Sequence, residues 1–275
     1  MTEDRPLDGD TLFYVYTVIE ASATDALPDM PPPLGGGGLR LVSAGRHAAV
    51  VEAVDALHFE EEPLRGHLED LEWLSAVARA HHGVVAAVGG ATTTVPMRLA
   101  TVCRGEEGVR RLLAGADERI AAALVRLAGA QEWGVKLYAG PPPAAPAAGG
   151  GTEGGGPAAG ASGGRDYLRR RLKDRDVREA SRTRAARTAR DLHRELSRHA
   201  AAAVLHPPQD RRLSRAEGLH VLNAAYLVPA AGREAFLDAV PPPDALDAGL
   251  RLEVTGPWVP YSFTAGADEE AGAAL

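Results

Sequence analysis

TLFYVYTVIE, residues 11–20, is the stretch that decides the fold, because its β-branched and aromatic side chains occupy both faces of an extended chain. A strand that is apolar on both faces is typical of the centre of a sheet covered on two sides. The runs LRLVSAG (39–45) and HAAVVEAV (47–54) flank Gly45-Arg46 and predict a hairpin. We therefore expect a sheet built around residues 11–20.

Helical spacing follows this hairpin. Apolar residues recur every three or four positions over residues 64–77, which predicts a helix that ends near His81-His82-Gly83. The next runs, VVAAV (84–88) and TVPMRLATV (94–102), are read as extended. An amphipathic pattern over residues 109–127 predicts one further helix. Strands and helices therefore mix in the first half of the chain.

A second set of elements begins with QEWGVKLY (131–138), whose alternation predicts a strand with one buried face. The elements expected after it are a helix over 166–200, strands over 202–206 and 219–228, a helix over 232–240 and a strand over 250–256. The resulting β-α-β-β-α-β order is the split motif of ferredoxin-like domains.

The segment AGPPPAAPAAGGGTEGGGPAAGASGG (139–164) interrupts this motif after its first strand. It contains no apolar side chain larger than Ala or Pro, so it cannot bury enough surface to offset its ordering entropy, and we expect a disordered insertion. The predicted class is α+β with two domains: a mixed α+β domain over 1–129, a ferredoxin-like domain over 130–263, and a disordered tail over 264–275. The alternative places the domain boundary within 139–164 itself.

Composition excludes several classes of protein. The chain has 275 residues, with Lys+Arg 30 against Asp+Glu 37 and a net charge of -7, which disfavours a general polyanion binder. Cys103 is the single cysteine, so an intramolecular disulfide and a thiolate-rich metal site are excluded. No apolar run reaches the roughly 20 residues that span a bilayer. We expect a soluble, cytoplasmic protein.

No arrangement of residues predicts catalysis. His81 and His82 are adjacent and point in different directions on either a helix or a strand, so they do not form a metal site together. No phosphate-binding glycine loop or nucleophile elbow is present. Cys103 closes an apolar run and is read as a buried small side chain rather than a reactive thiol. The prediction is a protein that is not an enzyme and has no cofactor, metal or small-molecule substrate.

The most unusual feature is a basic helix. Residues 165–198 hold 13 Lys+Arg and 6 Asp+Glu, a net charge of +7. At 100° per residue the cations lie around most of the helix, and the acids permit pairs such as Glu195 with Arg198. Three interpretations stay open: a solvated helix face, docking on an acidic protein, and nucleic-acid binding. We take Arg178, Arg182 and Arg187 as candidate contacts.

The stretch VTGPWVPYSF (254–263) concentrates two prolines and three aromatic residues after the last strand. Trp258, Tyr261 and Phe263 together could bury some hundreds of Å², at roughly 150–250 Å² per aromatic side chain. Two interpretations remain: packing of these side chains onto the rest of the fold, or an apolar anchor for a partner.

Seven blocks of this sequence, in this order, resemble the gas vesicle protein F/L (GvpF/GvpL) family. They are YVYTVIEA (14–21), WLSAVARAHHGVV (73–85), VPMRLATVCRGEEGVRRLL (95–113), LAGAQEWGVKLY (127–138), GRDYLRRRL (164–172), VLNAAYLVPAAGREAFLDAV (221–240) and LRLEVTGPWVPYSF (250–263). Where members of the family usually carry a charged stretch after EWGVK, this chain has mostly Gly, Ala and Pro, with Glu153 as the one charged residue of 139–164. The resemblance does not distinguish an F-type from an L-type member.

The resemblance implies a non-enzymatic, intracellular role in forming gas vesicles, with two α+β domains of which the second is ferredoxin-like. The implied partners are the hydrophobic vesicle shell protein and other vesicle accessory proteins, and no membrane is involved. Capture of the shell protein is expected at the sheet faces and around Trp258, Tyr261 and Phe263. The alternative function is a nucleic-acid-binding module that uses the Arg-rich helix 165–198.

Overall fold

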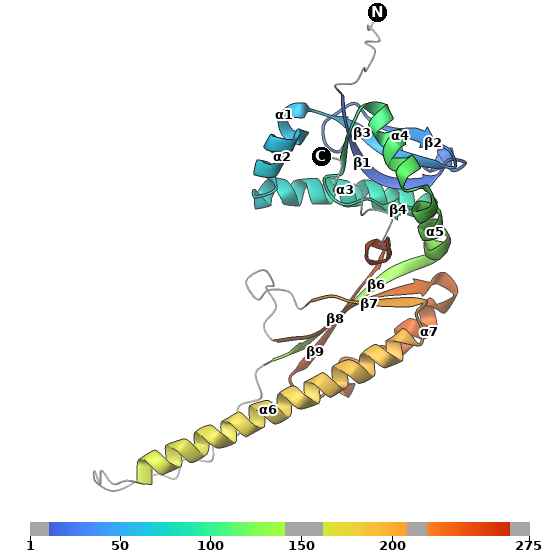
Figure 1. The fold of residues 1–275 in the computed structure, drawn as a ribbon. Coiled ribbons are helices and arrows are strands. Elements are labelled where there is room, and N and C mark those ends of the chain that lie inside the picture. Colours follow the sequence, from blue (N-terminus) through green and yellow to red (C-terminus); the bar gives the residue numbers. More distant parts are fainter. Residues whose placement is uncertain (1–10, 141–161, 208–218, 265–275) are drawn as a thin grey trace, which may run out of the picture. The chain divides into compact units, whose positions relative to one another are not determined.

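The computed structural model describes residues 11–140, 162–207 and 219–264 (Figure 1). The chain divides into two compact units. The first unit comprises the described residues up to Glu132 together with those from Pro257 onward, and the second unit runs from Trp133 to Gly256. The chain therefore leaves the first unit, builds the second, and returns to the first.

The sheet of the first unit is built around β1 (Leu12–Glu20). β3 (His47–Val54) pairs with β1 on one side, and β2 (Leu39–Ala44) pairs with β3. The short strands β4 (Val95–Pro96) and β5 (Val102–Arg104) also pair with β1. Every residue of β1 except the last is buried, which confirms the central strand that the sequence predicts.

The hairpin of β2 and β3 is also confirmed. Ala44 is opposite His47 in the register, so Gly45 and Arg46 form the turn. Gly45 has a φ of 60°, in the left-handed region that glycine adopts without the strain a side chain would cause. The local sequence, with a glycine at the position of positive φ, therefore specifies this turn.

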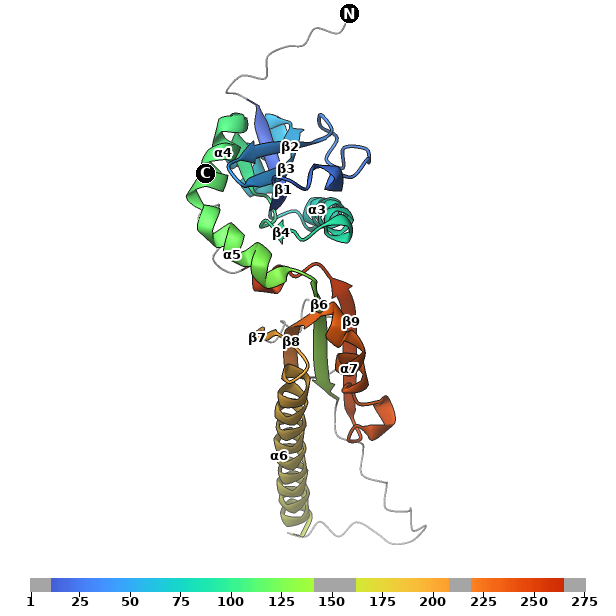
Figure 2. The same ribbon diagram turned by 90° about the vertical axis from the view of Figure 1, so that its right-hand side faces the viewer.

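Helices cover both faces of this sheet. α1 (Ala56–Phe59), α2 (Glu61–His67) and α3 (Leu71–Ala91) contribute to one core, with β1 and β3. α4 (Gly105–Gly115) and α5 (Asp117–Leu127) contact the sheet as well. Figure 2 shows α3 on one side of the sheet and α4 and α5 on the other. The sheet is therefore the middle of three layers.

A bulge in β1 sets which side chains face α3. The pairing with β3 shifts between Val15 and Thr17, so Tyr14, Tyr16 and then Ile19 enter the same core. Five α3 residues are buried, at helical spacing: Val77, His81, Val84, Val85 and Val88.

Three local predictions in the first unit are wrong. The single helix expected from residue 64 to near His81-His82-Gly83 is divided into α2 and α3, because the Asp70 side chain caps a new helix by accepting from the N–H groups of Glu72 and Trp73.

Residues 84–88 were expected to be extended, but α3 continues through them because their valines prolong the buried stripe of the helix. Packing against the sheet decides the structure of this β-branched run, and intrinsic propensity does not. The single helix expected over 109–127 is divided at Ala116, whose φ of -112° and ψ of 9° are not helical. Within 94–102, pairing is confined to β4 and the start of β5.

The second unit has a four-stranded sheet in the order β7-β8-β6-β9. Its strands are β6 (Ala130–Ala139), β7 (Ala202–Leu205), β8 (Leu219–Pro229) and β9 (Leu250–Trp258). α6 (Ser162–Ser197) follows β6, and α7 (Arg233–Asp238) follows β8. Short 3-10 turns complete the described chain: η1 (Thr24–Ala26), η2 (Ala230–Gly232), η3 (Pro243–Ala245) and η4 (Tyr261–Phe263).

One core joins this sheet to both of its helices. Alternate β6 residues, Trp133, Val135 and Leu137, are buried, which confirms the predicted strand alternation. They share the core with the C-terminal half of α6 and with Phe236 of α7. Figure 1 shows the other half of α6 continuing past the strands. On that half Leu172 is 56% exposed, so the apolar seam of this helix is buried only where the sheet supports it.

The predicted insertion 139–164 lies mostly outside the described residues, but its ends do not. Ala139 closes β6, and Ser162 begins α6. The predicted tail 264–275 lies outside them too, except for Thr264. This residue is 5% exposed and its hydroxyl donates a hydrogen bond to the Tyr261 carbonyl, so it belongs to the packed chain.

Candidate partner-contact surfaces

The candidate arginines lie along the middle of α6, Arg178 before the part that packs on the sheet and Arg182 and Arg187 within it. Arg178, Arg182 and Arg187 are all exposed. At 100° per residue Arg178 and Arg182 lie about 40° apart, whereas Arg187 is about 180° from Arg178. The structure therefore places the first two on one side of the helix and the third on the opposite side, so they do not form one contact patch.

Ion pairs occur near the C-terminal end of α6. The Arg198 guanidinium lies 3.0 Å from the Glu195 carboxylate, which confirms the predicted pair. Arg194 lies 3.1 Å from Asp191. Such exposed pairs contribute little to stability. They neutralise only some of the arginines, so the surface of α6 remains positively charged.

The C-terminal segment (residues 257–264) packs against α3 within the first unit. The Tyr261 ring centroid lies 6.2 Å from that of His81, and the Trp258 ring meets that of His82 at 5.4 Å. Val259 contacts α3 at Gly89, where an added Cβ would lie only 2.6 Å from the valine Cγ2. A side chain at position 89 would therefore force the Val259 side chain to move.

Polar contacts hold the end of the C-terminal segment. The Arg126 guanidinium donates two hydrogen bonds to the Phe263 carbonyl, at 2.6 and 3.1 Å. The Ser262 N–H and hydroxyl donate to the two carboxylate oxygens of Glu132, both at 2.8 Å. Phe263 itself is 5% exposed. These contacts hold the C-terminal segment on the first unit.

This placement differs from the prediction that residues 257–263 belong to the second domain. The reason is that their apolar side chains fill the surface of α3, a contact that sequence order does not reveal. Trp258 is 46% exposed and Tyr261 is half-buried. Of the three candidate aromatics, Trp258 therefore offers the largest accessible ring. The first sheet, expected as a capture surface, is covered by helices on both faces.

A buried cluster beneath the C-terminal segment was missed by the sequence analysis. The Tyr14 hydroxyl accepts a hydrogen bond from the Ala100 N–H at 3.1 Å and lies 3.0 Å from Nδ1 of His81. Burial lowers the pKa of His81 from 6.5 to about 4. The imidazole is therefore neutral at pH 7. Only the helical spacing of His81 with Val77 could have indicated that this residue is buried.

This cluster predicts a pH-dependent stability. Between about pH 6.5 and 4 the unfolded chain binds a proton at His81 and the folded chain does not, so the free energy of unfolding falls as the pH is lowered through this range. We expect a loss of about 2–3 kcal/mol from this residue. Urea unfolding at pH 7.5 and pH 4.5 should show a smaller loss in His81→Gln, whereas His58→Gln, an exposed control, should match the parent chain. Equal losses in all three proteins would contradict the assignment.

Glu52 of β3 forms a second buried polar cluster. Its side chain accepts a hydrogen bond from the Tyr16 hydroxyl at 2.6 Å and from the Gly36 N–H at 2.8 Å. The Leu34 N–H also donates to it, at 3.1 Å. Glu52 is fully buried, so this carboxylate joins the loop before β2 to the centre of the sheet.

Within residues 11–140, 162–207 and 219–264, no group of three His, Cys, Asp or Glu side chains is placed to hold a metal ion. Cys103 is buried as expected, and burial raises the pKa of its thiol to about 11. No helix in the described part of the chain is long and apolar enough to cross a membrane.

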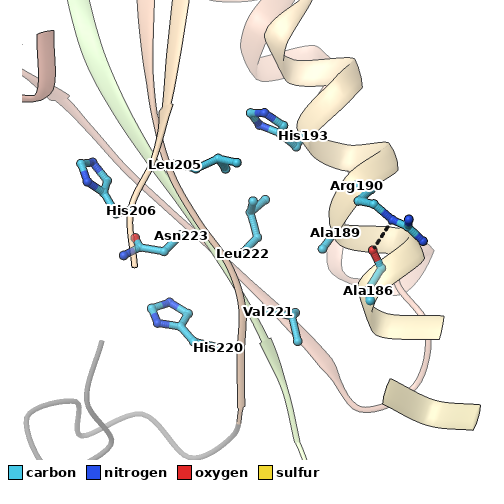
Figure 3. Close-up of a pocket in the computed structure, with 10 residues that line it drawn as sticks. All are labelled: Ala186, Ala189, Arg190, His193, Leu205, His206, His220, Val221, Leu222 and Asn223. Atoms are coloured by element: carbon cyan, nitrogen blue, oxygen red, sulfur yellow. Dashed lines mark hydrogen bonds between the residues drawn. The ribbon is translucent and has the colours of Figure 1, made fainter. Parts of the chain in front are cut away.

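The second unit contains a pocket of about 570 Å³ beside α6, β7 and β8. Figure 3 shows the residues that line it: Ala186, Ala189, Arg190, His193, Leu205, His206, His220, Val221, Leu222 and Asn223. The His193 ring is held by the Tyr226 hydroxyl, 2.9 Å from its Nδ1. The sequence analysis did not find this pocket, because it depends on the pairing of strands distant from α6 in sequence.

Comparison with known proteins gives consistent results. The family described as "Gas vesicle synthesis protein GvpL/GvpF" matches residues 12–265. A gas vesicle protein L from Streptomyces sp. (strain CB03234) is 47% identical over 261 residues, covering 95% of this chain and 96% of the relative. Two solved structures share the fold. GvpF from Anabaena sp. PCC7120 has a TM-score of 0.57 at 15% identity, covering 93% of this chain and 96% of its own. GvpF from Microcystis aeruginosa has a TM-score of 0.58 at 17% identity, covering 92% and 98%.

Proposed function

Because the chain belongs to the gas vesicle synthesis protein GvpL/GvpF family, we propose that it is an accessory protein of gas vesicle assembly that binds the hydrophobic shell protein and other vesicle accessory proteins. The match over residues 12–265 carries this proposal. The 47% identity to a gas vesicle protein L supports an L-type member. We place the protein in the cytoplasm at the gas vesicle, without catalytic activity.

The second unit supports the description as a ferredoxin-like domain. Its elements follow the order β6-α6-β7-β8-α7-β9 along the chain, which is a β-α-β-β-α-β motif. The sheet order β7-β8-β6-β9 places the first and third strands of the motif side by side at the centre. We therefore assign the domains as residues 11–132 with 257–264, and residues 133–256.

A physical mechanism follows from the surfaces. A hydrophobic shell protein aggregates before assembly unless its apolar surface is covered. Trp258, half-exposed on the first unit, supplies an apolar contact for its capture. The exposed arginines of α6, among them Arg178 and Arg182, supply charge that orients an acidic accessory partner. Apolar capture and electrostatic orientation are thus assigned to different units.

Deletion of the gene from its native cluster tests the proposed function. Electron microscopy should show absent, few or misshapen gas vesicles, and a plasmid copy of the gene should restore them. Normal vesicles in the deletion strain would contradict a role in assembly.

The charge argument makes a separate prediction. The double variant Arg178→Glu and Arg182→Glu reverses the charge at two exposed positions on one side of α6. We expect co-purification with other vesicle proteins at 150 mM NaCl to fall several-fold, since like charges now oppose an acidic partner. Arg187→Glu, on the opposite side, is the matched control. Equal recovery with all three proteins would remove this side of α6 as a contact.

The same variants test the alternative of nucleic-acid binding. A nucleic-acid-binding helix should retain DNA with a steep salt dependence, and the double variant should reduce the slope by about 2 in log units. Vesicle-protein binding without DNA retention supports the assembly role.

A further inference from the structure

Two histidines of the first unit bring their ring nitrogens together from α1 and α2, which lie side by side (Figure 1). Nδ1 of His58 is 3.2 Å from Nε2 of His67. Two nitrogens bound to one Zn²⁺ at about 2.0–2.1 Å, in tetrahedral or octahedral geometry, lie about 2.8–3.4 Å apart. The pair therefore has the separation of two neighbouring ligands of a metal ion.

The same distance also suits a hydrogen bond in the metal-free chain. One neutral imidazole then donates its N–H to the ring nitrogen of the other. A metal ion that binds both nitrogens takes the place of this shared proton. The two states need no rearrangement of the helices, so the free chain is already close to the geometry that a metal requires.

Aromatic packing holds both rings. The His67 ring stacks on Trp73 of α3, with the centroids 4.8 Å apart and the planes 14° from parallel. The Trp73 ring also lies 5.6 Å from that of Phe59, the buried residue that follows His58. The two histidines therefore share one aromatic support, and ligands held in this way lose less conformational freedom when a metal binds.

The surroundings of the pair are open and acidic. His58 is exposed and His67 is half-buried, so an ion and its water ligands can reach the nitrogens from solvent. Residues 55–72 hold seven Asp or Glu and one Arg. This excess of negative charge attracts cations to the site.

Several of these carboxylates have other partners. Glu61 and Glu62 pair with Arg65, at 3.0 and 3.1 Å, and Glu60 pairs with Arg104. This agrees with the observation that no three such side chains form a metal site in the part of the chain that the structure describes. The histidines are the ligands, and imidazole nitrogen suits Zn²⁺, Ni²⁺ and Cu²⁺, whereas Mg²⁺ and Ca²⁺ prefer oxygen.

We propose that His58 and His67 bind one divalent transition-metal ion of the class of Zn²⁺, Ni²⁺ and Cu²⁺, with water completing its coordination. The bound ion joins α1 to α2 and stabilises the first unit, because the unfolded chain does not hold the two rings together. The site is independent of the proposed function. The sequence analysis missed it, since the two histidines are nine positions apart on different helices.

Fluorescence of Trp73 tests the proposal, because this ring stacks on His67. In the full chain with Trp133→Phe and Trp258→Phe, Cu²⁺ at pH 7.5 should quench Trp73 in a saturable manner, with one ion per chain. Zn²⁺ has a filled d shell and does not quench, so it should compete with Cu²⁺ and restore the fluorescence. Mg²⁺ at the same concentration should have no effect.

Histidine variants locate the ion. His58→Gln leaves the ring stacked on Trp73 in place and should weaken Cu²⁺ binding at least tenfold, and His67→Gln should weaken it comparably. His82→Gln removes a histidine of α3 outside the pair and should change the affinity less than twofold. Circular dichroism of each variant verifies that the chain is folded.

Urea unfolding gives a second readout. Saturating Zn²⁺ should raise the midpoint of the Trp73 transition in the parent chain and in His82→Gln, since the ion binds only the folded first unit. The midpoint should not move with Zn²⁺ in His58→Gln. EDTA should reverse the shift wherever it occurs.

Four outcomes would overturn the proposal. Equal Cu²⁺ affinity of the parent chain, His58→Gln and His67→Gln would place the ion elsewhere. An equal response to Mg²⁺ would show attraction by carboxylates alone. Quenching that does not saturate at millimolar Cu²⁺ would leave only a hydrogen-bonded pair. One Zn²⁺ per two chains, in a dimer that EDTA dissociates, would show that a second copy and not water completes the coordination.

Discussion

Ending the chain at Gly256 will unfold or strongly destabilise the first unit. The truncation removes Val259, Tyr261 and Phe263, which pack against α3 and its neighbours. Phe263 is buried and Val259 and Tyr261 are partly buried, so at about 1.5–3 kcal/mol for a fully buried side chain we expect the free energy of unfolding to fall by about 3 kcal/mol or more. The hydrogen bonds from Arg126 and to Glu132 are lost as well.

The tryptophans allow this effect to be assigned to one unit. Trp73 belongs to the first unit and Trp133 to the second. Urea unfolding of single-tryptophan versions should show an early transition for Trp73 only, while the Trp133 transition stays in place. A chain that ends at Thr264 is the matched control and should unfold like the full chain. A shift confined to Trp133 would contradict the assignment of the C-terminal segment to the first unit.

Removing the buried carboxylate of Glu52 is the second change with a large expected effect. Glu52→Ala leaves the Tyr16 hydroxyl and the N–H groups of Leu34 and Gly36 without their acceptor, and also creates a cavity. At about 1–3 kcal/mol for each buried polar group left unsatisfied, we expect a loss of about 3 kcal/mol or more in the free energy of unfolding.

Two further variants separate this network from a general effect of losing an acid. Tyr16→Phe removes one donor and should lose about 1 kcal/mol. Glu118→Ala, on an 89% exposed side chain, should be neutral within about 0.5 kcal/mol. Amide hydrogen exchange at residues 34 and 36 should accelerate in Glu52→Ala. Unchanged exchange and stability would contradict the role assigned to Glu52.

The sequence predicts those parts of the fold that depend on short-range pattern. β1 and the hairpin of β2 and β3 have alternation, β-branched residues and a turn glycine within a few positions. The run 84–88 carries the same β-branched residues but is helical, because its valines complete a face begun seven residues earlier at Val77. Local composition does not distinguish these two cases.

The candidate surfaces show the same limit. The basic character of α6 is a property of consecutive residues, so it is visible in the sequence. The contact of Tyr261 with His81 and the hydrogen bonds around Glu52 join residues far apart in the chain, and no local pattern encodes them. The pocket beside α6, β7 and β8 forms where β7 pairs with β8, and this pairing joins residues far from α6 in the sequence.

The return of the C-terminal segment to α3 fixes an order of events during synthesis. A ribosome releases residues 11–132 long before residues 257–264, so the growing chain displays the apolar surface of α3 while the second unit is still being made. The second unit, whose residues are contiguous, can fold as soon as Gly256 has emerged. Nascent chains stalled before Pro257 should therefore recruit chaperones that recognise exposed apolar surface, and chains stalled well beyond Thr264 should release them.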